Sequence, residues 1–185
     1  MKGFLPTKRS YLNAQAAAMK RGDREAARVI YQELAQKAYA FFLSRVGQQS
    51  QAEDLTQETF MMVVRALDSF NENKGDFTVW FWQIARNKLI DFFRSQKNSV
   101  ISLDEELQIP TEHNTEQMVH HALLREKISA QLAGYDPRDQ ELFRLRFFAG
   151  LPYKDIARIA GKTEGAMRLK INRMQKEIKK QLHEA

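Results

Sequence analysis

The chain has 185 residues, of which 43% are hydrophobic, and it contains no cysteine. This composition suits one or two packed domains and excludes a disordered chain, a disulfide framework and a thiolate metal site. The net charge of +6 and the pI of about 9.5 favour a polyanionic partner. The N-terminus lacks the apolar core of a signal peptide, and no stretch reaches the roughly 18 apolar residues of a membrane span. We therefore expect a cytoplasmic protein without membrane insertion.

Helical spacing of apolar residues recurs along most of the chain, so the sequence predicts an all-α fold. An amphipathic segment spans residues 10–21. The next helix begins at Asp23, a good N-cap residue, and ends before Gly47. The run Ser50-Gln51-Ala52-Glu53 predicts a capping box that opens a second helix, which extends to about Phe70. Leu55, Thr59, Met62, Val63, Ala66 and Leu67 form its predicted inward stripe.

A third long helix, over residues 77–96, carries cations beside its aromatic side chains. Trp80 and Phe81 fall on its apolar stripe, whereas Trp82 and Phe93 lie off that stripe. Aromatic rings stack on unpaired bases and cations follow a phosphate backbone, so this composition suits single-stranded or opened DNA. A well-packed core helix explains the same residues equally well.

Residues 99–121 are acidic, contain no lysine or arginine and show weak periodicity. This composition predicts a flexible acidic linker between two small helical domains, residues 10–98 and 122–185. The first is a bundle of three to four helices. In the second, one helix covers about 116–133 and another runs over 136–150, opened by an Asp-Pro cap pair. Two more helices complete a four-helix domain.

These last two helices are joined by a tight turn at Gly161, and Thr163 opens the second one. A basic second helix after such a turn is typical of a helix-turn-helix, whose recognition helix lies in the DNA major groove. Residues 139–185 hold eleven Lys or Arg and six Asp or Glu, so most of the excess positive charge lies here. A solvated basic helix is the alternative. We expect base or nearby phosphate contacts from Glu164, Arg168 and Lys170, and phosphate contacts from Arg173 and Lys176.

Three stretches resemble the extracytoplasmic-function (ECF) sigma factors, group IV of the sigma-70 family, in the order that this family has them. They are AEDLTQETFMMVVRAL (52–67), FTVWFWQIARNKLIDFFR (77–94) and DQELFRLRFFAGLPYKDIARIAGKTEGAMRLKINRMQKEI (139–178). The resemblance implies an alternative sigma factor that binds core RNA polymerase, directs it to a bipartite promoter and promotes DNA melting. It implies core RNA polymerase, promoter DNA and an anti-sigma factor as partners. It implies no cofactor and no catalytic residue.

The resemblance also implies roles for individual residues. The first stretch implies a polymerase-binding helix, in which Asp54, Leu55, Gln57, Glu58 and Phe60 match the family pattern and the exposed members dock on the polymerase. The second implies a minus-10 DNA site made of Trp80, Arg86, Asn87, Lys88, Asp91 and Arg94. In it, Asn87 and its neighbours capture flipped bases, and Trp80 and Phe81 are the structural aromatics. The third implies minus-35 recognition by Thr163, Glu164, Gly165, Arg168, Lys170, Arg173 and Lys176.

The recognition helix departs from the family pattern. Members often read G-T-V-K-S-R where this chain has the run GAMRLK, residues 165–170. Leu169 therefore lacks a serine hydroxyl, and Lys170 lacks the bidentate fork of arginine. The promoter sequence is left open by these two changes.

Two other classes of protein compete with this interpretation. A conventional repressor or activator would bind duplex DNA through residues 137–180 and sense a signal with residues 1–98. A sensor domain has no need of the polymerase-binding and aromatic stretches, however. An enzyme would need side chains held in a catalytic or metal-binding geometry. The candidates lie in or beside the polar linker, and they are His113, His120, His121, Glu105, Glu106 and Glu116.

Overall fold

The computed structural model describes residues 8–98 and 116–184, which form helices joined by short turns, without a strand in these two ranges. The predicted all-α class is confirmed. Most of the predicted linker, including His113, lies outside the described residues, while its last residues, 116–121, belong to a helix. The elements are α1 (Lys8–Lys20), α2 (Arg24–Val46), α3 (Gln49–Ala66), the 3-10 turn η1 (Leu67–Ser69), α4 (Phe77–Asn98), α5 (Glu116–Leu132), α6 (Pro137–Phe147), α7 (Tyr153–Ala160) and α8 (Glu164–Glu184).

Side-chain caps and glycines set several helix ends as predicted. The Asp23 carboxylate accepts hydrogen bonds from the first backbone N–H groups of α2, and Gly47 ends this helix with a φ of 79°. Asp136 caps α6 in the same way, with proline in its first turn. Between α7 and α8, Gly161 adopts the left-handed conformation at φ 64°. The Thr163 hydroxyl then accepts a hydrogen bond from a backbone N–H of α8.

The predicted capping box at the start of α3 is wrong. Gln48 is the N-cap residue, and its side chain makes no capping hydrogen bond. Gly47 has already turned the chain, so the backbone N–H of Ala52 donates to the Gln48 carbonyl oxygen at 3.1 Å. Ser50 and Glu53 consequently lie inside the helix. Two other ends also differ, because α3 gives way to η1 at Leu67 and α6 stops at Phe147, before Gly150.

Helices α1 to α4 form one bundle around a core rich in aromatic side chains. Phe41 and Phe42 of α2 meet Phe81 and Trp82 of α4 in this core. The α3 stripe reaches it as predicted through its Leu, Thr and Val members, but Met62 is 36% exposed. Since a large burial of aromatic surface stabilises a small bundle, this core holds α3 and α4 in fixed positions.

Helices α5 to α8 form the second half of the structure. Leu132 of α5 and Phe143 of α6 pack against Met174 and Ile178 of α8. Ile156 of α7 is also fully buried, on the side of the helix-turn-helix that faces the rest of the chain. The core side of α8 is thereby covered along most of its length.

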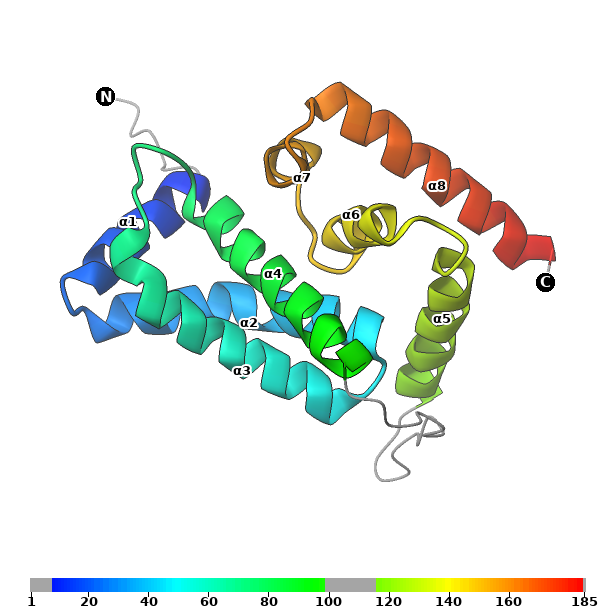
Figure 1. The fold of residues 1–185 in the computed structure, drawn as a ribbon, viewed down its shortest axis with the longest axis horizontal. Helices are drawn as coiled ribbons and strands as arrows, with labels where there is room; N and C mark the ends of the chain where they lie inside the picture. Colours follow the sequence, from blue (N-terminus) through cyan, green and yellow to red (C-terminus); the bar gives the residue numbers. More distant parts are fainter. Residues whose placement is uncertain (1–7, 99–115, 185) are drawn as a thin grey trace.

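The two halves pack against each other, with α7 beside α4 and with α5 and α6 beside α2 (Figure 1). Arg144 of α6 is buried, and its Nε donates to the Ser44 carbonyl oxygen of α2 at 3.2 Å. Burial lowers the pKa of Arg144 to about 10. Two ion pairs also cross this boundary, Arg86 with Glu141 and Arg158 with Asp76. Helix α8 runs along the outer edge of the second half, away from α1–α4 (Figure 1).

Candidate nucleic-acid and polymerase-binding surfaces

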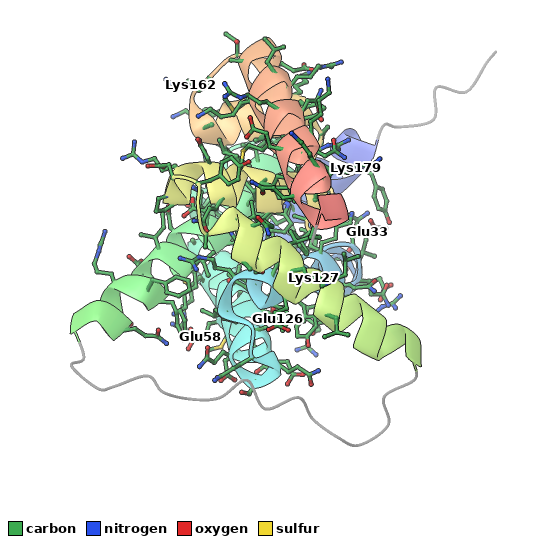
Figure 2. The ribbon with its side chains drawn as sticks, turned by 90° about the vertical axis from the view of Figure 1, so that its right-hand side faces the viewer. Glu33, Glu58, Glu126, Lys127, Lys162 and Lys179 are labelled. Carbon is green, nitrogen blue, oxygen red and sulfur yellow. The ribbon has the colours of Figure 1, made fainter. Side chains whose placement is uncertain are left out.

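Helix α8 has one buried side and one outward side. Met167 and Ile171 are buried, so helical periodicity turns Gly165 and Leu169 to the opposite side. Lys162, just before α8, and Lys179, near its end, are exposed and mark the two ends of this helix in Figure 2. We call the outward side the α8 outer face, made of Gly165, Arg168, Leu169, Asn172, Arg173 and Lys176, all exposed except Asn172, which is partly buried.

Three cations of α8 are paired with carboxylates at short range. Arg168 pairs with Glu164 at 2.8 Å, and Arg173 pairs with Glu177 at 2.8 Å, each within the helix. Both arginines are more than half exposed, so phosphates can replace the carboxylates at small cost. Lys170 differs, because its Nζ lies 2.7 Å from the Asp139 carboxylate of α6. The structure thus turns Lys170 toward the side of α8, off the outer face.

Tyr153, at the start of α7, supports two residues of the α8 outer face. Its hydroxyl donates to Oδ1 of Asn172 at 2.6 Å, and its ring lies 5.4 Å from the Arg168 guanidinium carbon. These contacts hold Arg168 and Asn172 in defined positions beside each other. Sequence reasoning missed Tyr153, since nothing in its spacing shows that it touches the next helix.

Gly165 and Thr163 lie at the start of α8. The Thr163 side chain serves as the cap of the helix, which is a structural role. A Cβ atom added at Gly165 would meet no other atom within 4 Å, so internal packing does not require glycine there. The absence of a side chain leaves the backbone open to a close approach from outside.

The predicted minus-10 residues occupy α4, and four of them are engaged in ion pairs. Arg86 pairs with Glu141 of α6 at 2.6 Å, and Lys88 pairs with Glu58 of α3. The Arg86 pair is mostly covered by protein, whereas Asn87 is exposed between the two cations. Asp91 and Arg94, also predicted to contact the minus-10 element, are both exposed and form an ion pair with 3.5 Å between guanidinium nitrogen and carboxylate oxygen.

The aromatic side chains of α4 belong mainly to the core. Trp82 is 0% exposed and meets Phe41 of α2 edge-on, so of the two interpretations left open by the sequence, the packed core holds for this residue and base stacking does not. Its ring packs between Phe41 and Phe81. Phe93 is partly buried beneath the guanidinium of Arg45, at 4.2 Å. Trp80 is also partly buried, against the ring of Phe70.

Helix α3 presents an exposed face that mixes carboxylates, an amide and apolar side chains. Asp54 and Gln57 are exposed as predicted. Leu55, however, is 2% exposed and cannot contact a partner, because it fills the bundle core. Phe60 is partly buried between Tyr31 and Phe81, and Glu58 is paired with Lys88. This face also has two exposed apolar members that no sequence signal had marked, Met61 and Val64.

Two kinds of site are not found in the part of the chain that the structure describes. No three His, Cys, Asp or Glu side chains gather closely enough to hold a metal ion. None of the helices of residues 8–98 and 116–184 is long and apolar enough to cross a membrane.

Two sequence families match this chain, one on each half. Residues 30–99 match Sigma-70 region 2, and residues 125–174 match Sigma-70, region 4. A bundle followed by a helix-turn-helix domain, matched in this order, places the chain in the sigma-70 family. Within that family, the chain belongs to the ECF sigma factors, as its similarity to curated members shows.

The relatives include the ECF RNA polymerase sigma factor BldN of Streptomyces coelicolor, 32% identical over 149 residues. That match covers 80% of this chain and 56% of BldN, so the chain spans little more than half of this relative's length. The ECF RNA polymerase sigma factor SigM of Bacillus subtilis is 27% identical over 150 residues, covering 81% of this chain and 91% of SigM.

Solved structures share the fold. CnrH, solved in complex with the cytosolic domain of CnrY, matches with a TM-score of 0.62 and 20% identity over 95% of this chain and 96% of that one. The sigma factor RpoE of Bartonella quintana, solved with the anti-sigma factor NepR, also has a TM-score of 0.62 and 20% identity, covering 84% of this chain and 96% of that chain.

Proposed function

We propose that this chain is an alternative sigma factor that binds core RNA polymerase, directs it to bipartite promoters and promotes melting of the DNA. The observation that carries the proposal is the exposed, cationic α8 outer face on a capped helix-turn-helix, joined in one chain to the exposed α3 face and to Asn87 on α4. RNA synthesis stays with the polymerase, so the chain needs no catalytic residue or cofactor. The proposed polymerase partner implies a cytoplasmic location.

The two halves bind different partners in this proposed function. Residues 10–98 bind core polymerase and the minus-10 element, and residues 122–185 bind the minus-35 element. On α3, the exposed residues Asp54 and Gln57 dock on polymerase, and Met61 and Val64 add apolar area to that face. Leu55 supports the helix from inside. An anti-sigma factor that covers these surfaces is a further expected partner.

Melting follows from preferential binding to the open form of DNA. A flipped base exposes its Watson-Crick edge, and a side chain that binds this edge shifts the duplex equilibrium toward the open state. Asn87 suits this role because its amide both donates and accepts hydrogen bonds and is exposed on α4. Arg86 and Lys88 beside it would stabilise the phosphates of the displaced strand.

In vitro transcription tests the proposed function directly. The purified chain is mixed with sigma-free core polymerase and a library of promoter fragments, and transcripts are sequenced. We expect co-elution with core polymerase and a defined set of start sites. A chain that neither co-elutes with core polymerase nor yields specific start sites is not a sigma factor.

Substitution of Asn87 separates melting from duplex binding. In Asn87→Ala, binding of the holoenzyme to the upstream element should persist, while open-complex formation, measured by permanganate reactivity of unpaired thymines, should fall. Gln36→Ala removes another exposed amide, from α2, and is the matched control. Equal loss of both steps in Asn87→Ala would contradict the assigned role.

A second substitution tests base recognition by α8. Arg168→Ala should change the preferred minus-35 sequence, because a bidentate arginine contact to guanine contributes about 1–3 kcal/mol of discrimination. Arg28→Ala is the control, since Arg28 also pairs with a glutamate one turn away on its own helix. A uniform loss across all sequences would identify Arg168 as a phosphate contact instead.

A further inference from the structure

Leu169 lies at the centre of the α8 outer face. It is 76% exposed, more than any other large hydrophobic side chain in the described part of the chain. Met167 and Ile171, two positions before and after it, are buried in the core. Leu169 therefore points directly away from the protein, and no packing within the described residues explains an apolar side chain there.

A single exposed leucine carries little meaning on an ordinary surface, because such residues are common and leucine favours helices. The position of Leu169 gives it more weight. Its neighbours on the α8 outer face are polar or cationic, with Arg168 before it and Asn172 and Arg173 one turn later. An apolar side chain in the middle of a cationic, DNA-facing surface needs an apolar group on the DNA.

The groups around Leu169 are also held in place. Arg168 is fixed between Glu164 and the Tyr153 ring, and Asn172 is fixed by the Tyr153 hydroxyl. Gly165, one turn earlier, leaves that part of the face open for a close approach. The helix can therefore enter a groove deeply enough for a leucine side chain to reach base edges.

In the major groove, the thymine 5-methyl is the apolar group that base edges present. We propose that Leu169 reads a thymine methyl in the upstream promoter element, and so selects thymine at one position there. This inference rests on the proposed function, since it requires α8 in the major groove. It assigns specificity to the position where this chain lacks the serine that members of its family often have.

The test uses holoenzyme assembled from the full chain and sigma-free core polymerase. Duplex fragments with a randomised upstream element are selected for binding, and the preferred element is sequenced. Each thymine of that element is then replaced by deoxyuridine, which lacks only the 5-methyl group. We expect one replacement to weaken binding about four-fold, which corresponds to ~0.8 kcal/mol for one buried carbon group.

Three variants connect this effect to the side chain. In Leu169→Ser, the preference for thymine over uracil at that position should disappear, and in Leu169→Met it should remain. Leu123→Ser removes another exposed leucine, on α5, and should leave the uracil effect unchanged. The deoxyuridine series on the unaltered chain needs no variant, so the absence of any uracil effect overturns the assignment even if a substitution disturbs folding.

The outcomes separate this inference from the proposed function. If a preferred element is selected but no thymine shows a uracil effect, or if the effect persists in Leu169→Ser, the Leu169 assignment is wrong and the sigma function stands. If no upstream element is selected, both are wrong. If Leu169→Ser instead weakens binding to core polymerase without DNA, and the uracil effect is unchanged, Leu169 contacts a protein and the inference is overturned.

Discussion

Helices α4 and α8 both carry cations that we assign to DNA, yet these cations have different neighbours. On α8, Arg168 and Arg173 pair with carboxylates of their own helix, in solvent. On α4, Arg86 pairs with Glu141 of the other half, and this pair is mostly covered. The ion pair of Arg158 with Asp76 lies along the same boundary.

The difference indicates that the two helices meet DNA under different conditions. The α8 outer face can enter a groove as it stands, because exchanging exposed carboxylates for phosphates costs little. Arg86 can reach DNA only when its pair with Glu141 breaks, either by a change of side-chain rotamer or by separation of α6 from α4. We expect separation of the halves to accompany reading of the minus-10 element.

The largest effect should come from the aromatic core beneath α4. Trp82→Ala removes a fully buried ring and should lower the free energy of unfolding by about 3–5 kcal/mol. Urea denaturation followed by circular dichroism measures this loss, and Trp82→Phe should retain most of the stability. If Trp82→Ala keeps the free energy of unfolding of the unaltered chain but fails to form open complexes, the tryptophan contacts DNA. The contrast between the two helices would then be weaker.

The stability that Tyr135 contributes by its contact with α8 should depend on pH. Burial, together with its hydrogen bond to Glu177, raises the pKa of Tyr135 to about 12. Because the folded pKa lies above the ordinary value of 10, this contribution to stability is complete below pH 10 and is lost as the pH rises through about 12. Tyr135→Phe should cost about 1 kcal/mol near neutral pH. In an ultraviolet titration, the variant should lack the tyrosine that ionises at the highest pH. An unchanged titration curve would contradict the assignment.

A substitution at Gly165 should separate stability from DNA binding on α8. A methyl group meets no other atom there, so Gly165→Ala should raise the free energy of unfolding by up to about 1 kcal/mol. Binding to the upstream element should nevertheless weaken, because the methyl blocks a close approach of the backbone. Melting temperature and fluorescence anisotropy with labelled DNA measure the two effects. Unchanged DNA binding would mean that the start of α8 stays away from the duplex.

The smallest effect should come from the ion pair between the halves. Arg158→Ala should shift the halves toward separated arrangements by about 0.2–1 kcal/mol, since the arginine is partly exposed. The chain has no cysteine, so cysteines placed at Glu53 and Lys179 allow site-specific labelling and distance measurement. Arg28→Ala breaks a pair within α2 and should leave the distances unchanged. Equal distances in all variants would show that this pair does not hold the halves together.

Local sequence signals predicted the elements well where the signal itself forms the structure. Asp23, Gly47, Asp136 and Gly161 act through backbone geometry and short hydrogen bonds, so their roles depend little on the rest of the chain. The capping box at Ser50 failed because Gly47 had already set the start of α3. Where two capping signals lie a few residues apart, the packing of the neighbouring helices determines which of them becomes the start of the helix.

Candidate site residues were less predictable than helices. Helical periodicity placed the exposed side of α8 correctly, since that helix has one core side. On α4 it misplaced Trp82, because this helix packs against α1, α3 and α7, and Trp82 also meets Phe41 of α2, so that more than one stripe is buried. Periodicity correctly placed Leu55 on the inward stripe of α3, whereas the resemblance counted it among the residues of the polymerase-binding pattern.

Local features of the sequence were enough to predict the helical class, the helix-turn-helix with its charge, and the membership of the ECF sigma factors. These features depend on spacing, on caps and on residue type, all of which are local. Tertiary structure alone decided which cations are engaged across the two halves, that Lys170 turns toward Asp139, and that Leu169 stands alone at the centre of the α8 outer face. The physical reason is that pairing and exposure depend on neighbours far away along the chain.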